Sequence, residues 1–240
     1  MAQVVLAATA DIHSPKYLDE FLRAVDSFEG TPDLILLAGD MVYRGRVEEF
    51  AKVLEPLESL GSRILAIFGN EEYDDLKPRF LETYGDRVQW LDDQGVEVEI
   101  RGLGLWIVGS RGSLKRPTTW QSKHIPGIEE IYRARVSLLD ELLAEAGERK
   151  AILMTHYAPT FKTLVGENPK IWSRLGHPGL ERVIKRRRPA LVIHGHAHNG
   201  AKEARVNGVP VYNVSFPVWR EIVRLTLPLT EEVGLESYMV

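Results

Sequence analysis

The sequence predicts a single α/β domain, residues 1–240, that contains more strand than a simple doubly wound fold. Three observations support this prediction. Strand-like and helix-like segments alternate through the first half, short strands separated by turns follow from about residue 88, and no linker or shift of composition divides the chain. With 240 residues, 44% of them hydrophobic and 27% charged, the chain can bury a core without disulfides.

The first half of the chain shows three β-α units. Each predicted strand is a short apolar run, and the helices follow from apolar periodicity or from a start signal such as Ser14-Pro15. Successive β-α units form a mostly parallel sheet, in which the carboxyl ends of the strands share one edge and ligands collect there. The predicted elements are strand Val4–Ala8, a helix ending near Phe28, strand Asp33–Ala38, helix Val47–Leu60, strand Arg63–Phe68 and a helix near Leu76–Tyr84.

The second half begins with three short strands, Val88–Trp90, Val96–Ile100 and Leu105–Ser110, whose turns are typical of an antiparallel meander. Later elements follow from helical spacing, apolar runs and the hairpin signal Asn207-Gly208. They are helix Ile128–Ala146, strand Ala151–Thr155, helix Gly179–Arg188, strand Ala190–His194, strands Ala201–Val206 and Val209–Val214, strand Glu221–Leu227 and a polar tail. We therefore expect two long loops, residues 111–127 and 157–176.

Charge and cysteine content exclude several classes of function. Lys plus Arg is 30 and Asp plus Glu is 34, a formal net charge of −4 that attracts neither nucleic acid nor an anionic membrane. The chain has no cysteine, which excludes thiolate metal sites and a cysteine nucleophile. The first residues lack the basic region of a signal peptide and no apolar run is long enough for a membrane span. We expect a cytoplasmic protein.

Polar residues recur where the predicted buried strands end. A cluster of carboxylate, amide and imidazole groups at one sheet edge suits Mn, Fe, Zn, Co or Ni better than Mg or Ca, which prefer oxygen ligands. Each of these short polar motifs alone is common by chance or has a structural explanation. Five such motifs, each at the end of an independent strand, favour a metal site. The residues are Asp11, His13, Asp40, Asn70, His156, His194, His196 and His198.

These motifs resemble those of the calcineurin-like metallophosphoesterases. That family carries D-x-H, G-D, G-N-H-[D/E], a lone His and G-H-x-H in this order. The matching segments are Asp11-Ile12-His13, Gly39-Asp40, Gly69-Asn70-Glu71-Glu72, His156 and Gly195-His196-Ala197-His198. The resemblance spans residues 11–198 and implies two mixed β-sheets packed together and flanked by helices.

The resemblance also implies two divalent transition metal ions. One would be held by Asp11, His13, Asp40 and His198, and the other by Asp40, Asn70, His156 and His196, so that Asp40 bridges them. In the family, a hydroxide shared by the metals attacks phosphorus in line. The activity implied is that of a phosphohydrolase, with a phosphodiesterase acting on a small phosphodiester or nucleotide as the favoured form. His194 matches no ligand position and is expected to be a hydrogen-bonded structural residue.

Three residues are expected to act on the substrate: Asn70, Glu71 and Arg44. Glu71 stands where the family has the His that contacts phosphate and can protonate the leaving group. The site would carry one net positive charge with two divalent ions, two aspartates and a hydroxide. A monoanionic diester would neutralise this charge. An ionised Glu71 facing the phosphate would repel the substrate. Three options follow: Glu71 is protonated and is the acid, it turns away and binds backbone, or another group is the acid. The last two are slightly favoured.

Arg44 lies in a segment, Gly39 to Gly45, that resembles the phosphate-binding G-D-x-V-D-R-G of the Ser/Thr phosphatases, with Tyr43 in place of Asp. A solvated loop arginine is an equal alternative.

Two other functions stay open: a metal-dependent nuclease, which the acidic balance disfavours, and a non-catalytic scaffold that retains the fold. The one dense basic run, Lys185–Arg188, is expected on the face opposite the site. Exposed final strands would allow pairing of two copies.

Overall fold

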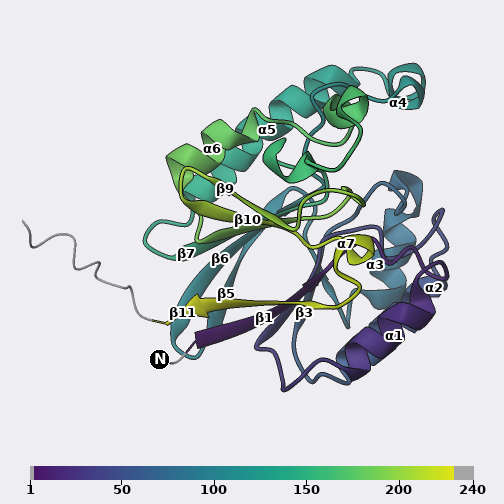
Figure 1. The fold of residues 1–240 in the computed structure, drawn as a ribbon, viewed down its shortest axis with the longest axis vertical. Helices are drawn as coiled ribbons and strands as arrows, with labels where there is room; N and C mark the ends of the chain where they lie inside the picture. The colour runs from purple at the N-terminus through teal and green to yellow at the C-terminus, as the bar shows by residue number, and fades with distance from the viewer. Residues whose placement is uncertain (1–2, 230–240) are drawn as a thin grey trace, which may run out of the picture.

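Two mixed β-sheets lie face to face in the computed structural model, which describes residues 3–229, and helices cover both outer faces (Figure 1). This is the α/β architecture that the sequence predicts. The polar tail lies outside the described residues. The part of the chain from 3 to 229 contains no helix with the length and apolarity needed to cross a membrane.

The first sheet has the strand order β11-β1-β2-β3-β4. Strands β1 to β4 run parallel, and β11 joins β1 in antiparallel register from Gln3 opposite Pro228 to Ala8 opposite Val223. The strands are β1 (Gln3–Thr9), β2 (Leu34–Leu37), β3 (Ile64–Ala66), β4 (Gln89–Trp90) and β11 (Val223–Pro228).

The second sheet has the order β5-β6-β7-β8-β10-β9, with antiparallel pairs at both edges and parallel pairs between them. Asn207 and Gly208, both at positive φ, form the two-residue turn of the β9–β10 hairpin, as predicted. The strands are β5 (Gln94–Ile100), β6 (Leu103–Ser110), β7 (Lys150–Thr155), β8 (Leu191–His194), β9 (Glu203–Val206) and β10 (Val209–Asn213).

The apolar core has two main clusters. The larger one joins buried residues of both sheets, such as Leu6 and Ile193, to Phe21 and Phe50 of the helices under the first sheet. The second lies between the outer face of the second sheet and two helices, where Leu139 is fully buried. The helices are α1 (Leu18–Asp26), α2 (Glu49–Glu58), α3 (Lys77–Tyr84), α4 (Thr119–His124), α5 (Ile128–Ala144), α6 (Leu180–Arg187) and α7 (Phe216–Trp219), with 3₁₀ turns η1 (Asp74–Leu76), η2 (Lys162–Leu164) and η3 (Pro169–Arg174).

Two predictions about elements are wrong. The expected meander does not form, because β4 pairs in parallel with β3 in the first sheet while β5 and β6 start the second. The first helix begins at Leu18 rather than near Ser14, because Ser14 is held in a bridge to Val42. The short helices α4 and α7 and the 3₁₀ turns within the loops were not predicted. They lack the repeated apolar spacing that marks longer helices.

Parallel strands of both sheets end at one common edge. The chain leaves β1, β2 and β3 of the first sheet and β7 and β8 of the second at this edge. The polar residues that follow each strand in the sequence are therefore brought together from segments up to 187 positions apart.

Candidate metal centre

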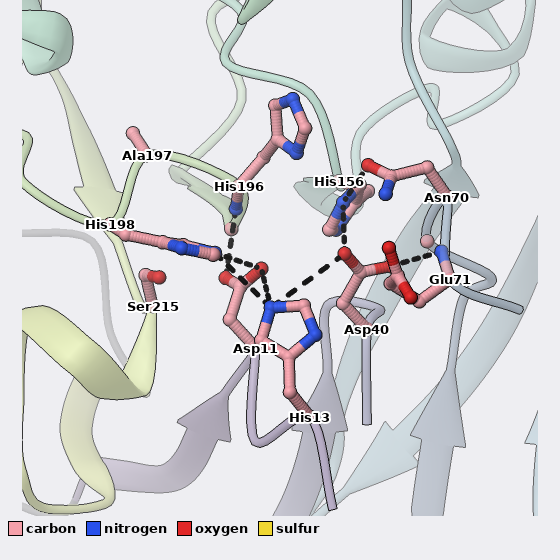
Figure 2. A network of polar contacts seen from close by, with 12 residues as sticks. Asp11, His13, Asp40, Asn70, Glu71, His156, His196, Ala197, His198 and Ser215 are labelled. Carbon is pink, nitrogen blue, oxygen red and sulfur yellow. Dashed lines mark hydrogen bonds and ion pairs between the residues drawn. The ribbon is translucent and has the colours of Figure 1, made fainter. Parts of the chain in front are cut away.

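Two groups of side chains that could each hold a metal ion lie side by side at this edge (Figure 2). The first group is Asp11, His13 and His198, and the second group is Asp40, His156 and His196. Within each group, one ligand atom from every residue lies within 4.8 Å of the others. All six belong to the seven ligands expected from the sequence.

Asp40 lies between the two groups. Its Oδ2 is 3.4 Å from His156 Nε2 in the second group and 3.9 Å from His13 Nε2 in the first. Its Oδ1 accepts the backbone N–H of Glu71 at 2.7 Å, which holds the carboxylate in this orientation. This is the position expected for a bridging ligand. The seventh expected ligand, Asn70, lies beside the second group, with its Oδ1 3.1 Å from His156 Nε2.

The donor atoms converge as a pair of cations requires. His156 Nδ1 donates to the carbonyl of Ala38 at 2.9 Å, so Nε2 of the neutral ring carries a lone pair that faces Asn70 and Asp40 oxygens. In the first group, the Nε2 atoms of His13 and His198 are 3.3 Å apart. Lone pairs this close repel one another unless a proton or a cation lies between them. The residues present therefore fit two divalent ions.

Without a bound metal, the carboxylates of the site favour a proton on one of its histidines, His156. Burial alone would lower the pKa of His156, but the Asp40 carboxylate beside it raises that pKa to about 9. Burial would also raise the pKa of Asp11, yet the nearby histidines, His198 foremost, hold it well below its usual range. By contrast, burial and the neighbouring His156 lower the pKa of His196 to about 3, so this ring is neutral and ready to ligate.

In the metal-free protein, we expect the free energy of unfolding to fall as the pH rises from about 6.5 to about 9. The folded-state pKa of His156, about 9, exceeds its ordinary value of 6.5, so the folded chain binds this proton more tightly than the unfolded chain. That stabilisation is complete below pH 6.5 and is lost as the pH passes through 9. Urea unfolding with a chelator at about pH 6 and about pH 9.5 measures the change. An equally steep change in His156→Gln would contradict the assignment.

Four residues of the two groups have left-handed backbone: Asp11 (φ 60°), His13 (φ 46°), Asp40 (φ 56°) and His196 (φ 68°). This region is sparsely populated by residues other than glycine, and each such residue costs of order 1–3 kcal/mol and persists only where the surrounding structure holds it. Strain of this kind gathers at functional sites. Here the strained residues lie in the loops that leave β1, β2 and β8. Their left-handed backbone conformation turns the side chains toward a common centre.

Two glycines of the motifs are required by close backbone approach. A Cβ on Gly195 would lie 2.6 Å from the Cβ of Ala10 and 2.7 Å from Asp11 Oδ2. A Cβ on Gly69 would collide with the Asp40 carboxylate. Glycine at these positions therefore allows the loops to meet, which is a physical reason for G-H-x-H and G-N in this chain.

Glu72 is a residue of the site to which the sequence assigned no role. It is almost fully buried (1% exposed), and its Oε2 accepts the backbone N–H groups of Asp40 (2.8 Å) and Gly69 (2.7 Å). Its Oε1 accepts the N–H of Val42 at 3.2 Å. Burial and repulsion by Asp40 raise the pKa of Glu72 to about 7. Glu72 thus fastens the loop of Asp40 to the loop of Asn70, and a carboxylate directly after Gly-Asn-Glu was the only signal for it.

Glu71 does not point freely into the site. Its Oε2 accepts the backbone N–H of Arg44 at 2.7 Å, and its own backbone holds Asp40 and Gly45. This arrangement corresponds to the second of the three options, in which the carboxylate binds backbone. The Arg44 guanidinium lies over the Tyr43 ring, 4.9 Å from its centroid, and forms no hydrogen bond or ion pair with either group among residues 3–229. The Tyr43 ring is in turn 6.4 Å from that of His13.

His194 lies outside both groups. It is fully buried, its Nε2 is 2.8 Å from Thr163 Oγ1, and its Nδ1 is 2.8 Å from the carbonyl oxygen of Gly195. Burial lowers the pKa of His194 to about 4, so the ring is neutral. Through its contacts with Gly195 and Thr163, His194 stabilises the loop that carries His196 and His198. This is the structural role expected for it.

Comparison with known proteins identifies the family and the fold. The family model described as calcineurin-like phosphoesterase matches residues 4–200. The phosphopantetheinyl hydrolase of Mycobacterium tuberculosis has a similar structure, with a TM-score of 0.69 at 16% identity over 89% of each chain. A putative 5′-nucleotidase from Staphylococcus aureus, solved with alpha-ketoglutarate, has a TM-score of 0.61 at 13% identity over 96% of this chain and 52% of its own. At these identities the two structures show a shared fold. No curated protein sequence matches the chain.

Proposed function

The chain belongs to the calcineurin-like phosphoesterase family, and from this premise we propose that it is a metal-dependent phosphoester hydrolase whose preferred substrates are small phosphodiesters. The observation that carries the proposal is the position of Asp40 between two groups of ligand-competent side chains. Two divalent cations held there would stabilise phosphoryl charge and activate water as the nucleophile. Their identity, with manganese as one candidate among Mn, Fe, Zn, Co and Ni, belongs to the same proposal.

The chain's own residues prepare this site in three ways. Asp11 and Asp40 supply the anionic oxygens, and their burial keeps the electrostatic interactions strong. The carbonyl of Ala38 fixes the His156 ring so that Nε2 faces the centre. Glu72 holds the loops of Asp40 and Asn70 at a constant spacing. The site is thus preorganised by hydrogen bonds between buried side chains and the backbone.

The preference for a diester rests on charge. Glu71 adds a carboxylate beside the site where a histidine would add a proton donor, and Arg44 is engaged with Tyr43. A monoanionic diester brings less negative charge to such a site than a dianionic monoester. A screen of aryl phosphodiesters, aryl monoesters and cyclic nucleotides with Mn, Co, Ni and Zn, after removal of metal by a chelator, tests the proposal. Metal-dependent cleavage of diesters is expected, and activity on monoesters alone would overturn the preference.

Glu71→Gln is expected to leave kcat on a phosphodiester nearly unchanged. The amide oxygen of glutamine can still accept the Arg44 N–H, and on this proposal a group other than Glu71 protonates the leaving oxygen. The measurement is kcat from about pH 6 to about pH 9 with metal content determined at each point. Glu99→Gln, at an exposed position on β5, is the matched control. A large loss at high pH with both metals retained would assign Glu71 as the acid.

A nuclease is the nearest alternative, and the charge distribution disfavours it. The basic run Lys185–Arg188 lies at the end of α6, before β8, whereas His196 and His198 follow the other end of that strand. Two of its arginines bind Asp140 of α5, through Arg186 Nη2 at 2.6 Å and Arg187 Nε at 2.9 Å. Salt-dependent binding of the protein to DNA would favour the nuclease function again.

Three further expectations from the sequence are kept as proposals: a small phosphoester as the partner, a cytoplasmic location and pairing of two copies of the chain.

A further inference from the structure

The ring of His196 lacks the polar contacts that hold other histidines of the two groups. The ring nitrogens of His156, for example, lie 2.9 Å from Ala38 O and 3.1 Å from Asn70 Oδ1. His196 is bonded through its backbone N–H, which donates to Asp11 Oδ2 at 2.8 Å, and its ring forms no hydrogen bond or ion pair among residues 3–229 (Figure 2). Within the described part of the chain, the orientation of this ring therefore depends on packing.

Tyr157 supplies this packing. Its ring meets the ring of His196 edge to face, with the two centroids 4.9 Å apart and the planes at 69°. The Tyr157 ring also lies 5.5 Å from the ring of His156, which is itself 4.9 Å from the ring of His196. Edge-to-face contact at a centroid distance of about 4.5–7 Å is a favoured arrangement of aromatic rings. Tyr157 therefore packs against both histidines of the second group.

Tyr157 is itself held firmly. The residue is 2% exposed and belongs to a small apolar cluster that includes Leu114 and Tyr132. Its backbone N–H donates to the carbonyl of Arg111 at 3.0 Å, and its carbonyl accepts the hydroxyl of Thr155 at 2.9 Å. Because the backbone and the cluster both restrain it, the Tyr157 ring forms a fixed wall beside the second group.

A fixed neighbour matters for His196 because this ring must keep one rotamer to act as a ligand. One ring nitrogen lies within 4.8 Å of ligand atoms of Asp40 and His156. Rotation about the bonds of the His196 side chain would carry that nitrogen away from the other two ligands. A ligating histidine is usually oriented by a hydrogen bond from its second ring nitrogen to the protein. For His196, the Tyr157 ring takes the place of that hydrogen bond.

We propose that Tyr157 is a positioning residue whose ring keeps His196 in the orientation in which the second group binds a divalent ion. The inference rests on the proposed function, because it takes the second group to be the site of a cation. Tyr157 acts through His196, and the property that matters is the rigid ring. Its hydroxyl makes only a long contact, 3.5 Å, with Gln121 Nε2.

The experiment measures Mn²⁺ binding to chelator-treated wild type, Tyr157→Phe and Tyr157→Leu by isothermal titration calorimetry. We expect Tyr157→Leu to weaken the binding of one of the two ions by about tenfold or more, because a ligand has lost the group that orients it. Tyr157→Phe keeps the ring and is expected to bind both ions as wild type does. Tyr84→Leu is the matched control, since Tyr84 is also buried and packs edge to face on Phe50 at 5.0 Å, at the end of α3. It is expected to lower the Tm and to leave Mn²⁺ binding unchanged.

A double-mutant cycle separates positioning from a general loss of structure. His196→Ala removes the ligand through which Tyr157 acts, so adding Tyr157→Leu to it is expected to weaken Mn²⁺ binding no further. An additive loss in the double variant would overturn the proposal. Unchanged Mn²⁺ binding in Tyr157→Leu, or an equal loss in Tyr157→Phe, would overturn it as well.

Nuclear magnetic resonance of the metal-free wild type tests the contact without relying on any variant to fold. We expect nuclear Overhauser effects between the ring protons of Tyr157 and those of His196, and their absence would overturn the proposal for Tyr157 alone. A wild-type protein that binds fewer than one Mn²⁺ per chain would instead overturn the proposed function, and this proposal with it.

Discussion

Asp40→Asn is expected to bind fewer than one divalent ion per chain and to lose about a thousandfold in kcat/KM on phosphodiesters. The Asp40 carboxylate is placed between the two groups, with Oδ2 3.4 Å from His156 Nε2 and 3.9 Å from His13 Nε2. Asparagine would keep its oxygen toward the Glu71 N–H, which is 2.7 Å from Oδ1, and would turn its NH₂ group toward the centre. A donor there repels cations from both groups at once.

Metal analysis after dialysis and the rate of diester cleavage measure this effect. The side chains of aspartate and asparagine have nearly the same shape, so the variant should fold. Asp26→Asn, an exposed aspartate at the end of α1, is the matched control and should behave as wild type. Two ions per chain and full activity in Asp40→Asn would show that the bridging position has been wrongly assigned.

Glu72→Gln is expected to lower the free energy of unfolding by about 1–3 kcal/mol. The Glu72 carboxylate accepts three backbone N–H groups, from Asp40, Gly69 and Val42. The NH₂ group of glutamine cannot accept, so at least one buried N–H loses its partner and faces another donor. The spacing of the Asp40 and Asn70 loops should loosen as well, and metal affinity should fall with stability.

Urea unfolding at about pH 8, above the raised pKa of about 7, gives the stability change with Glu72 ionised. Calorimetric titration with Mn²⁺ gives the metal affinity of the same samples. Glu99→Gln again provides the control, because its side chain is exposed on β5, in the other sheet. If Glu72→Gln unfolds at the wild-type urea concentration and binds metal as tightly, the loops are held by other contacts.

The parts of this protein that the sequence predicts well are those with local causes. Each ligand follows a buried strand within a few residues, so the strand pattern alone places Asp11, Asp40 and His156 at a common edge. The Asn207-Gly208 turn is likewise determined by its own two residues, both at positive φ. Local signals of this kind do not depend on which strands become neighbours.

Other features depend on contacts between distant segments, and the sequence could not supply them. The two-residue strand β4 joins the first sheet because Trp90 pairs with Ala66, a tertiary contact with no local signature. The orientation of Glu71 follows from the N–H of Arg44, 27 residues away.

The central claim is that the two groups hold two divalent ions and that these ions make the protein a phosphoester hydrolase. The most direct measurement is a titration of chelator-treated protein with Mn²⁺, in which bound metal per chain and cleavage of bis(p-nitrophenyl) phosphate are followed in the same samples. We predict saturation near two ions per chain, with activity rising as the second ion binds. Saturation below one ion, or two bound ions without cleavage of any ester in the substrate screen, would contradict the claim.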